Sequence, residues 1–248
     1  MHILVTNDDG IQSPALQQLR THLSALGRVS VVAPDRNQSA TSQALTLHRP
    51  LRIHPLGDDT WSVDGTPAYC VLVAFHGKLM ERPTLVVSGI NHGPNMGEDV
   101  FYSGTVAAAI EGSLQGVPAL AASLVTRIPT DFAEPAAMVA ELVSQLLRRP
   151  MGPRTLLNVN FPFCPRAQLA GVQVTRLGSR VYEDTLVRKV DPRGHDYYWI
   201  GGEDPVWRPE PGTDFHAVHS GFVSVTPMHL DLTDAAALEV LREHPLTL

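Results

Sequence analysis

Two neighbouring carboxylates stand at the first polar turn of the chain. Asp8 and Asp9 follow a short apolar run that begins at Ile3, and Gly10 comes directly after them. Adjacent carboxylates repel each other, which raises the pKa of one of them unless a cation is present. A hard divalent cation such as Mg²⁺ or Mn²⁺ relieves that repulsion and prefers carboxylate and amide oxygens. The alternative is an ordinary Asp-Asp-Gly surface turn, in which these residues are common.

Two later loops carry further oxygen ligands. The loop over residues 34–42 holds Ser39, whose hydroxyl is suited to a metal or a phosphate, although the loop by itself is more simply an ordinary polar connection. The loop over residues 88–99 is more informative, because Asn91 places a neutral amide oxygen directly after an apolar run. Its glycines also permit close approach of the backbone to a ligand. We therefore expect an anion-plus-metal site built from all three loops.

A helix start follows the third loop at Ser103-Gly104-Thr105. The first turn of a helix presents free amides and the positive end of the helix dipole, which suits a phosphate. The alternative is that Ser103 only caps its helix, and the two interpretations are compatible. The residues that we expect to bind phosphate are Asn37, Ser39, Asn95, Ser103, Gly104 and Thr105.

Other catalytic signatures are absent from the sequence. There is no Gly-x-Ser-x-Gly elbow of a serine hydrolase, no Walker-type phosphate loop, and no pair of histidines at metal-binding helical spacing. Dehalogenase-type phosphatases need a second Asp two residues after the first, but residue 10 is Gly10. A receiver module would need an acceptor Asp where this chain has Asn91, and the chain is too long for one such module. The aromatic residues Tyr197, Tyr198, Trp199 and Trp207 could stack on a base, but such clusters more often serve packing.

These loops need a scaffold that brings them to one edge, and the hydrophobic pattern predicts it. Short apolar runs alternate with helical periods, which favours a mostly parallel sheet with helices on both faces. In such sheets ligands bind beyond the carboxyl ends of the strands. The expected strands are 1–6, 29–33, 84–88, 119–124, 156–161 and 222–226, with a hairpin over 52–63; the expected helices are 14–27, 67–80, 103–115, 133–149 and 234–243.

The last third of the chain differs in composition. Residues 180–214 are rich in Tyr, Trp, Pro and Gly without a helical period, which predicts hairpins or an extended arm. With no internal repeat and no low-complexity linker, we expect a single α/β domain over residues 1–248 with this arm appended. The terminal helix over 234–243 completes it.

Composition limits the partners and the compartment. The formal net charge of -6 argues against a surface that binds nucleic-acid polymers, but not against a mononucleotide. Two distant cysteines, Cys70 and Cys164, suit neither a disulfide framework nor a structural zinc site. We see no leader segment and no apolar run long enough to span a bilayer, so the cytoplasm is the expected location.

Several distinct motifs recur along the chain, at residues 3–10, 33–39, 88–91, 102–106, 158–162 and 223–227. Through these stretches the sequence resembles the stationary-phase survival protein SurE family of 5'/3'-nucleotidases over nearly its whole length. The motifs occur in the family's order, which makes the resemblance specific. One departure is Tyr69, where the family commonly has Asp.

The resemblance implies a Rossmann-like fold and one divalent metal ion per subunit, Mg²⁺ or Mn²⁺, held by Asp8, Asp9, Ser39 and Asn91. It implies hydrolysis of nucleoside monophosphates, and also of short polyphosphate. We expect a metal-activated water to attack phosphorus, with Asp8, Asp9 and Asn91 as the catalytic residues. The resemblance also implies a homodimer or homotetramer that exchanges C-terminal segments.

Overall fold

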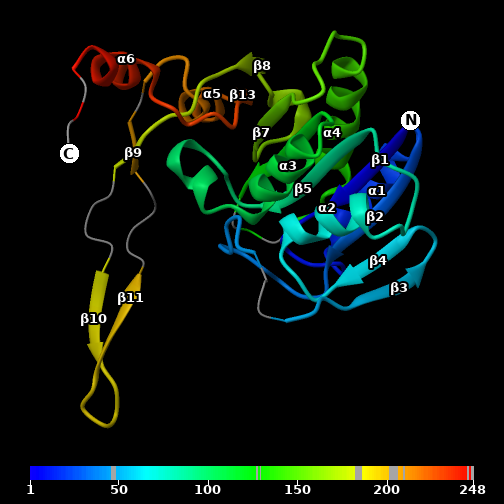
Figure 1. Ribbon diagram of the computed structural model, residues 1–248, viewed down its shortest axis with the longest axis horizontal. Helices are drawn as coiled ribbons and strands as arrows, with labels where there is room; N and C mark the ends of the chain where they lie inside the picture. The colour runs from blue at the N-terminus through cyan, green and yellow to red at the C-terminus, as the bar shows by residue number, and fades with distance from the viewer. Residues whose placement is uncertain are drawn as a thin grey trace.

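The main sheet of the computed structural model carries the three predicted loops at one edge (Figure 1). The structure describes residues 1–45, 49–126, 128, 130–181, 186–200, 206–208, 210–244 and 246. Within these residues the sheet has nine strands, in the spatial order β3 (Ile53–Gly57), β4 (Thr60–Val63), β2 (Arg28–Pro34), β1 (His2–Thr6), β5 (Leu85–His92), β6 (Ala119–Val125), β7 (Leu156–Pro162), β13 (Phe222–Met228) and β8 (Gly171–Val174).

Six neighbouring strands, from β4 to β7 in that order, run parallel. β3 is antiparallel to β4, and β13 is antiparallel to β7 while β8 runs parallel to β13. β1 lies near the middle, between β2 and β5, and its five residues are all buried. A strand that is covered on both faces is mostly apolar, as this one is from Ile3 to Val5.

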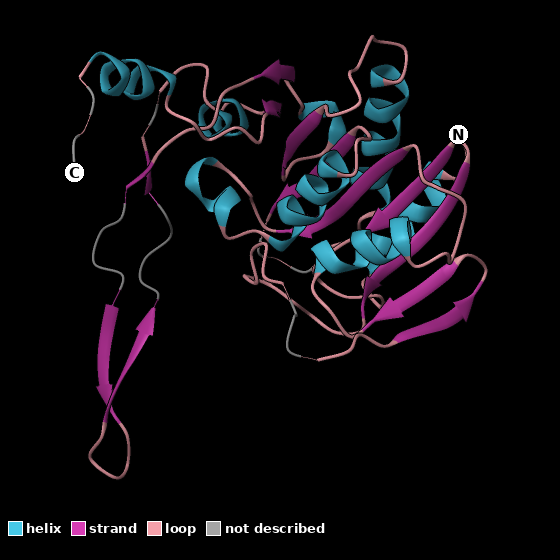
Figure 2. Cartoon of the chain, in the orientation of Figure 1, coloured by secondary structure: helices cyan, strands magenta, loops and turns pink. Residues whose placement is uncertain are grey.

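Helices cover both faces of the sheet, as the hydrophobic pattern predicts (Figure 2). α1 (Pro14–Leu23) and α4 (Ala133–Leu146) pack on one face, in a core that includes Ile3 and Val5. α2 (Pro67–His76) and α3 (Gly104–Leu114) pack on the other, in a core that includes Leu4. Successive strand residues point to opposite faces, so β1 contributes to both cores. The predicted mostly parallel α/β fold is confirmed.

Some boundaries and elements differ from the prediction. α2 ends at His76 and not near Met80, because Gly77 caps it and Lys78 adopts a positive φ of 54°. The strand β8 and the short helix α5 (Asp214–His219) were not predicted. Two 3₁₀ helices, η1 (Gly97–Phe101) and η2 (Arg166–Gln168), were not predicted either.

The predicted arm over 180–214 is a long hairpin that extends from the sheet (Figure 1). β9 (Arg180–Val181) pairs with β12 (Val206–Trp207), and further out β10 (Leu186–Val190) pairs with β11 (Asp196–Ile200). Residues 182–185, 201–205 and 209 of the predicted arm lie outside the described residues.

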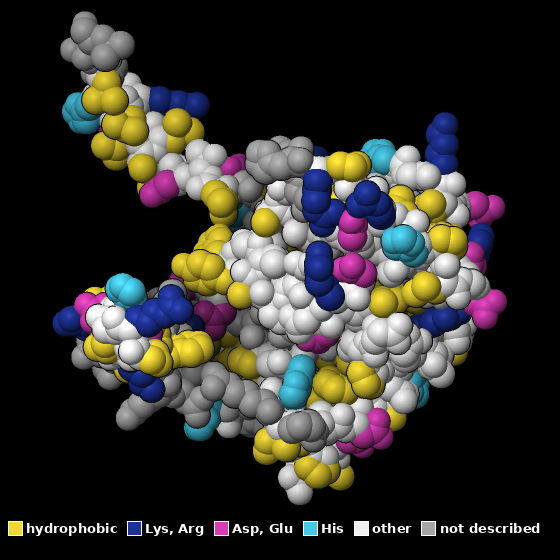
Figure 3. Space-filling view, turned by 90° about the horizontal axis from the view of Figure 1, so that it is seen from below, with side chains coloured by type: hydrophobic (Ala, Val, Ile, Leu, Met, Phe, Trp, Pro, Cys, Tyr) yellow, Lys and Arg dark blue, Asp and Glu magenta, His cyan; other side chains and the backbone are white. Residues whose placement is uncertain are grey.

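The terminal helix α6 (Ala235–Glu243) matches the predicted helix to within one residue at its start. None of its residues is buried, and hydrophobic side chains stand clear of the body on this helix and on the hairpin (Figure 3). Across the part of the chain that the structure describes, no helix is long and apolar enough to cross a membrane.

Candidate active site

The loop after β1 is a tight turn that carries two acids at the carboxyl end of the strand. The Asn7 side chain brackets it, since Nδ2 donates to the Gly10 carbonyl at 3.1 Å and Oδ1 accepts the Gly10 amide at 3.2 Å. Gly10 has φ +99°, and a Cβ there would lie 3.0 Å from the carbonyl carbon of Arg36. The turn therefore requires glycine and fixes the backbone that carries Asp8 and Asp9.

The loop after β2 is bonded directly to the first loop. The Gln38 amide donates to the Asp8 carbonyl at 2.7 Å, which places the neighbouring Ser39 close to the acids along the backbone. The Asn37 Oδ1 accepts the Ser39 amide at 2.8 Å, so this side chain stabilises its own loop. Both Asn37 and Ser39 are exposed and accessible to a ligand.

The end of β5 meets the second acid, because this strand extends to His92 and so includes the first residues of the predicted third loop, Asn91 among them. The backbone amide of His92 interacts with the Asp9 carboxylate and lowers its pKa. The Asn91 Nδ2 donates to the Gly93 carbonyl at 3.0 Å, which orients the side chain and leaves its Oδ1 as an acceptor. The contact between Asp9 and His92 therefore brings the first and third loops together, as the parallel sheet predicts.

The start of α3 contacts the first acid. Ser103 caps the helix, because its Oγ accepts the Val106 amide at 3.0 Å. Thr105 is fully buried, and its Oγ1 donates to Asp8 Oδ1 at 2.5 Å. Gly104 permits this close approach, since a Cβ there would lie 2.8 Å from Asp8 Cβ. The hydroxyl of Thr105 is thus directed to the acid, while Ser103 has the capping role that we considered.

Asn95 is the predicted residue with a different environment. Its hydrogen bonds go to the strands β6 and β7: its amide donates to Asn160 Oδ1 at 2.9 Å and its Nδ2 to Ser123 Oγ at 2.8 Å. Its carbonyl accepts the side chains of Asn158 and Asn160. Asn95 therefore anchors the third loop, and phosphate binding by this residue stays a prediction.

The two acids lie in an environment that disfavours their charge. Burial raises the pKa of Asp8 from 3.8 to about 6, against hydrogen bonds from Thr105 that lower it, and the nearby Asp9 charge raises it further. Burial also raises the pKa of Asp9, against the His92 amide, which lowers it. Among the described residues, the one basic side chain that shifts either pKa is His92, whose charge lowers that of Asp9. A cation at this point would remove the cost of holding two charges there.

The ligands available for such a cation are oxygens of mixed type. Among the described residues there is no group of three or more His, Cys, Asp or Glu side chains able to hold a metal. A site here would therefore combine two carboxylates with neutral oxygens, which Ser39 and Asn91 offer. Hard divalent cations accept such oxygen sets.

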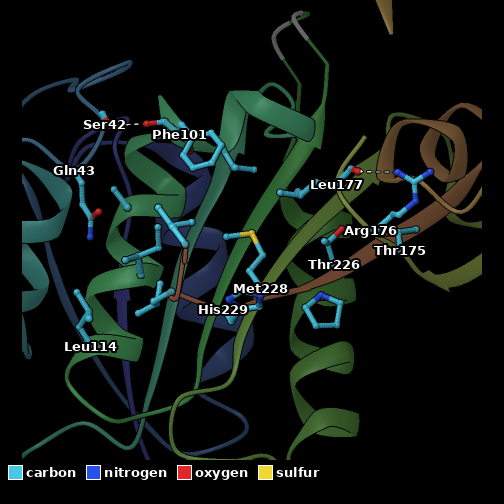
Figure 4. A pocket seen from close by; sticks show the side chains of 17 residues that line it. Ser42, Gln43, Phe101, Leu114, Thr175, Arg176, Leu177, Thr226, Met228 and His229 are labelled. Atoms are coloured by element: carbon cyan, nitrogen blue, oxygen red, sulfur yellow. Dashed lines mark hydrogen bonds between the residues drawn. The ribbon is translucent and has the colours of Figure 1, made fainter. Parts of the chain in front are cut away.

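An apolar groove lies beside the two acids and the loops that surround them. It has a volume of about 590 Å³ and runs along α3, with Phe101 at one end and Leu114 at the other (Figure 4). Ser103 is the one predicted site residue in its lining, and neither Asp8 nor Asp9 reaches it. The groove and the acid pair are thus separate features that meet at the start of α3.

The sequence analysis did not identify two groups of supporting residues. Ser123, Asn158 and Asn160 hold Asn95 from strands far along the chain, and Asp214 accepts the Gly97 amide at 2.8 Å across 117 residues. Only Asn158 and Asn160 gave a signal, as part of the stretch 158–162 that carries the family resemblance.

Comparisons with known proteins give relatives over the whole chain. The family model described as survival protein SurE matches residues 3–184. A 5'-nucleotidase SurE of Geobacter sulfurreducens is 49% identical over 248 residues, covering 100% of this chain and 95% of the relative. One of Pelobacter propionicus is 50% identical over 97% of this chain and 98% of the relative. The crystal structure of the SurE protein from Aquifex aeolicus has a TM-score of 0.89 at 43% identity, covering 98% of this chain and 99% of that one.

Proposed function

The chain belongs to the survival protein SurE family, and on this basis we propose that it is a 5'-nucleotidase, a hydrolase that releases phosphate from nucleoside monophosphates. The observation that carries the proposal is the Asp8–Asp9 pair at the carboxyl end of β1. Both carboxylates have raised pKa values, and the start of α3 stands beside them. Such a pair suits a cation, and a helix start suits the phosphate that the cation would draw.

The hydrolysis depends on one divalent metal ion, Mg²⁺ or Mn²⁺, held by Asp8, Asp9, Ser39 and Asn91. The donor set supports this, because it offers two carboxylates, an amide oxygen and a hydroxyl, and among the described residues no lysine or arginine lowers the pKa of either acid. When bound, the ion supplies positive charge that polarises the phosphoryl group and favours attack by water at phosphorus.

The protein's own groups orient the reactants. Thr105 holds Asp8 in one rotamer through its hydroxyl, and the tight turn at Gly10 fixes Asp9 beside it. The first amides of α3, at Gly104 and Thr105, stabilise phosphate oxygens as negative charge develops on them. Ser103, Asn37, Ser39, Asn91 and Asn95 are the other groups that we assign to the phosphate. Asp9 is the less buried acid, and its carboxylate accepts a proton from the attacking water.

A phosphate-release assay with AMP tests this function. The dialysed full-length protein is assayed with EDTA and then with added Mg²⁺ or Mn²⁺; we expect activity only with the metal. Asp9→Asn abolishes it, whereas Asp131→Asn, which changes a carboxylate at the start of α4, leaves it unchanged. Full activity in EDTA, or an active Asp9→Asn enzyme, contradicts the proposal. Short polyphosphate and 3'-monophosphates in the same assay test the wider substrate range.

We further propose that the enzyme is a homodimer or homotetramer formed through its C-terminal region. Exposed apolar residues on the hairpin and on α6 support this, among them Leu186, Tyr198, Trp199 and Leu241. The cytoplasm is the proposed location, since both Cys70 and Cys164 are free thiols, which suits a reducing compartment. Nucleoside monophosphates are the proposed partners, and with a net charge of -6 we expect no binding of nucleic-acid polymers.

A further inference from the structure

The third loop is held on two sides by different parts of the molecule. On the side of Asn95, side chains of β6 and β7 bind its backbone and its amide. On the other side, η1 contacts the root of the arm, by which we mean residues 178–181, 206–208 and 210–214. The segment that leads from Asn91, at the end of β5, into α3 is therefore held by a distant part of the chain as well as by β6 and β7.

Asp214 makes the central contact between the loop and the arm root. Its Oδ2 accepts the Gly97 amide at 2.8 Å, and its Oδ1 accepts the amides of Gly178 and Phe215, each at 2.8 Å. The side chain has no exposed surface. A buried carboxylate is costly unless its oxygens are satisfied, and here three backbone amides satisfy both of them. Asp214 thus joins η1, the outgoing arm segment and α5 at one point.

Close packing reinforces this junction. Gly97 has φ +53°, and a Cβ on it would lie 2.6 Å from both the Gly178 carbonyl oxygen and a ring atom of Trp207. Trp207 and Met96 are buried together in a small cluster of their own. The arm root therefore cannot move toward Gly97 without displacing the backbone of the loop.

A hydrogen bond and an ion pair connect the next two residues of η1 to the same root. The Arg180 amide donates to Glu98 Oε2 at 2.7 Å, and its Nη1 donates to Asp99 Oδ1 at 2.8 Å. Only 24% of the Arg180 side chain and 21% of the Asp99 side chain are exposed, so solvent screens this pair less than a surface pair.

We propose that Asp214 is a positioning residue of the active site. Through its hydrogen bonds, the position of the arm root affects the binding of metal and phosphate. By holding Gly97 against Gly178, it fixes the path from Asn91 to Ser103. The inference rests on the proposed function, because the ligands that the loop positions are those of the nucleotidase site. A group that orients a metal site from outside the ligand set changes metal affinity without touching the ion, and Asp214 acts through the segment between Asn91 and Gly97.

The test compares Asp214→Asn with Asp191→Asn as the matched control. Asp191 also accepts backbone amides, from Arg193 and His195, but it lies at the tip of the arm. Three quantities are measured on the full-length protein: hydrogen exchange of the peptide that contains Gly97, the Kd of Mn²⁺ by calorimetry, and KM and kcat for AMP. We expect Asp214→Asn to speed exchange at Gly97 and to raise the Kd of Mn²⁺ by about tenfold to a hundredfold. Asp191→Asn changes none of them.

A second variant keeps the test decisive if Asp214→Asn does not fold. Asp99→Asn weakens the Arg180 contact at a partly exposed position, and it moves exchange and the Kd of Mn²⁺ in the same direction by less. A merely structural role would lower the melting temperature and leave the Kd of Mn²⁺ unchanged. That result, with folded Asp214→Asn or Asp99→Asn, overturns the inference. A wild-type protein that does not hydrolyse AMP would instead refute the proposed function. Hydrogen exchange and Mn²⁺ binding would then still show whether Asp214 affects the metal site.

Discussion

Thr105 Oγ1 lies 2.5 Å from Asp8 Oδ1, in a hydrogen bond that joins the start of α3 to the turn after β1. Thr105 is fully buried and Asp8 nearly so, so no water competes for the contact. One oxygen of the Asp8 carboxylate is thereby fixed by the protein, which leaves Oδ2 as the oxygen available to a cation. The geometry of the proposed metal site thus depends on a residue that does not itself bind the metal.

Removing the Thr105 hydroxyl should weaken the site without unfolding it. Thr105→Val keeps the shape but loses the donor, so Asp8 is free to rotate; we expect kcat/KM for AMP to fall by about tenfold to a hundredfold, with weaker Mn²⁺ binding. Thr105→Ser keeps the hydroxyl and should retain most of the activity. Steady-state kinetics and calorimetry measure both. Equal activity in the valine and serine variants would show that the hydroxyl does not orient Asp8.

Asp8→Asn should make the metal-free protein more stable while it abolishes activity. The pKa of Asp8 is about 6 in the folded chain, against 3.8 for the free group. The folded state therefore binds more protons than the unfolded state across this window, and stability falls as pH rises from about 4 to 6. At neutral pH the charged Asp8 costs roughly 3 kcal/mol at most, and an amide removes that cost. Melting temperatures in EDTA should be higher for Asp8→Asn at neutral pH and similar to wild type near pH 4.

Added Mn²⁺ provides the control for this stability difference. The wild-type protein should gain melting temperature with the metal, because the ion binds the folded state, whereas Asp8→Asn should gain little. An Asp8→Asn protein that melts below wild type in EDTA at neutral pH would mean that the buried charge of Asp8 does not destabilise the folded protein.

Gly104 should tolerate no side chain, because it is pressed against the first acid. A Cβ at residue 104 would lie 2.8 Å from Asp8 Cβ and 3.0 Å from Asp8 Oδ2. Gly104→Ala should therefore displace Asp8 or the helix start, and we expect a loss of about a hundredfold in kcat/KM. Gly152→Ala is the matched control, since the nearest atom to its Cβ would be 3.9 Å away. Comparable kinetics of the two variants would contradict the packing argument.

The local sequence pattern was sufficient to locate most of the helices and strands and the turn that carries Asp8 and Asp9. β1 has an apolar run from Ile3 to Val5 before its polar turn, and α3 begins at its Ser103 cap, so both could be located from neighbouring residues alone. The parallel sheet then implied that the turn after β1 lies beside the carboxyl end of β5, as the interaction between Asp9 and the His92 amide shows.

Long-range contacts could not be located in this way. Asp214 reaches Gly97 across 117 residues, and the pairing of Asn95 with Asn158 and Asn160 depends on the register of β6 and β7. The edge strand β8 has mostly exposed residues, and so it lacks the apolar run by which buried strands are found. Nothing within a few residues of these positions encodes which partner they meet.

Charged residues on the arm should separate the proposed oligomer into monomers. Val187 and Trp199 are cross-strand partners on one face of the hairpin, and 42% and 62% of their surfaces are exposed. A second copy of the chain would bury these side chains, so aspartate at both positions places two charges in the interface and costs several kcal/mol. The combined variant Val187→Asp and Trp199→Asp should sediment as a monomer, whereas Lys78→Asp, which changes the net charge by the same amount at an exposed position of the body, should sediment as wild type. Wild-type protein that sediments as a monomer, or a combined variant that keeps the oligomeric mass, would show that this face of the arm is not an interface.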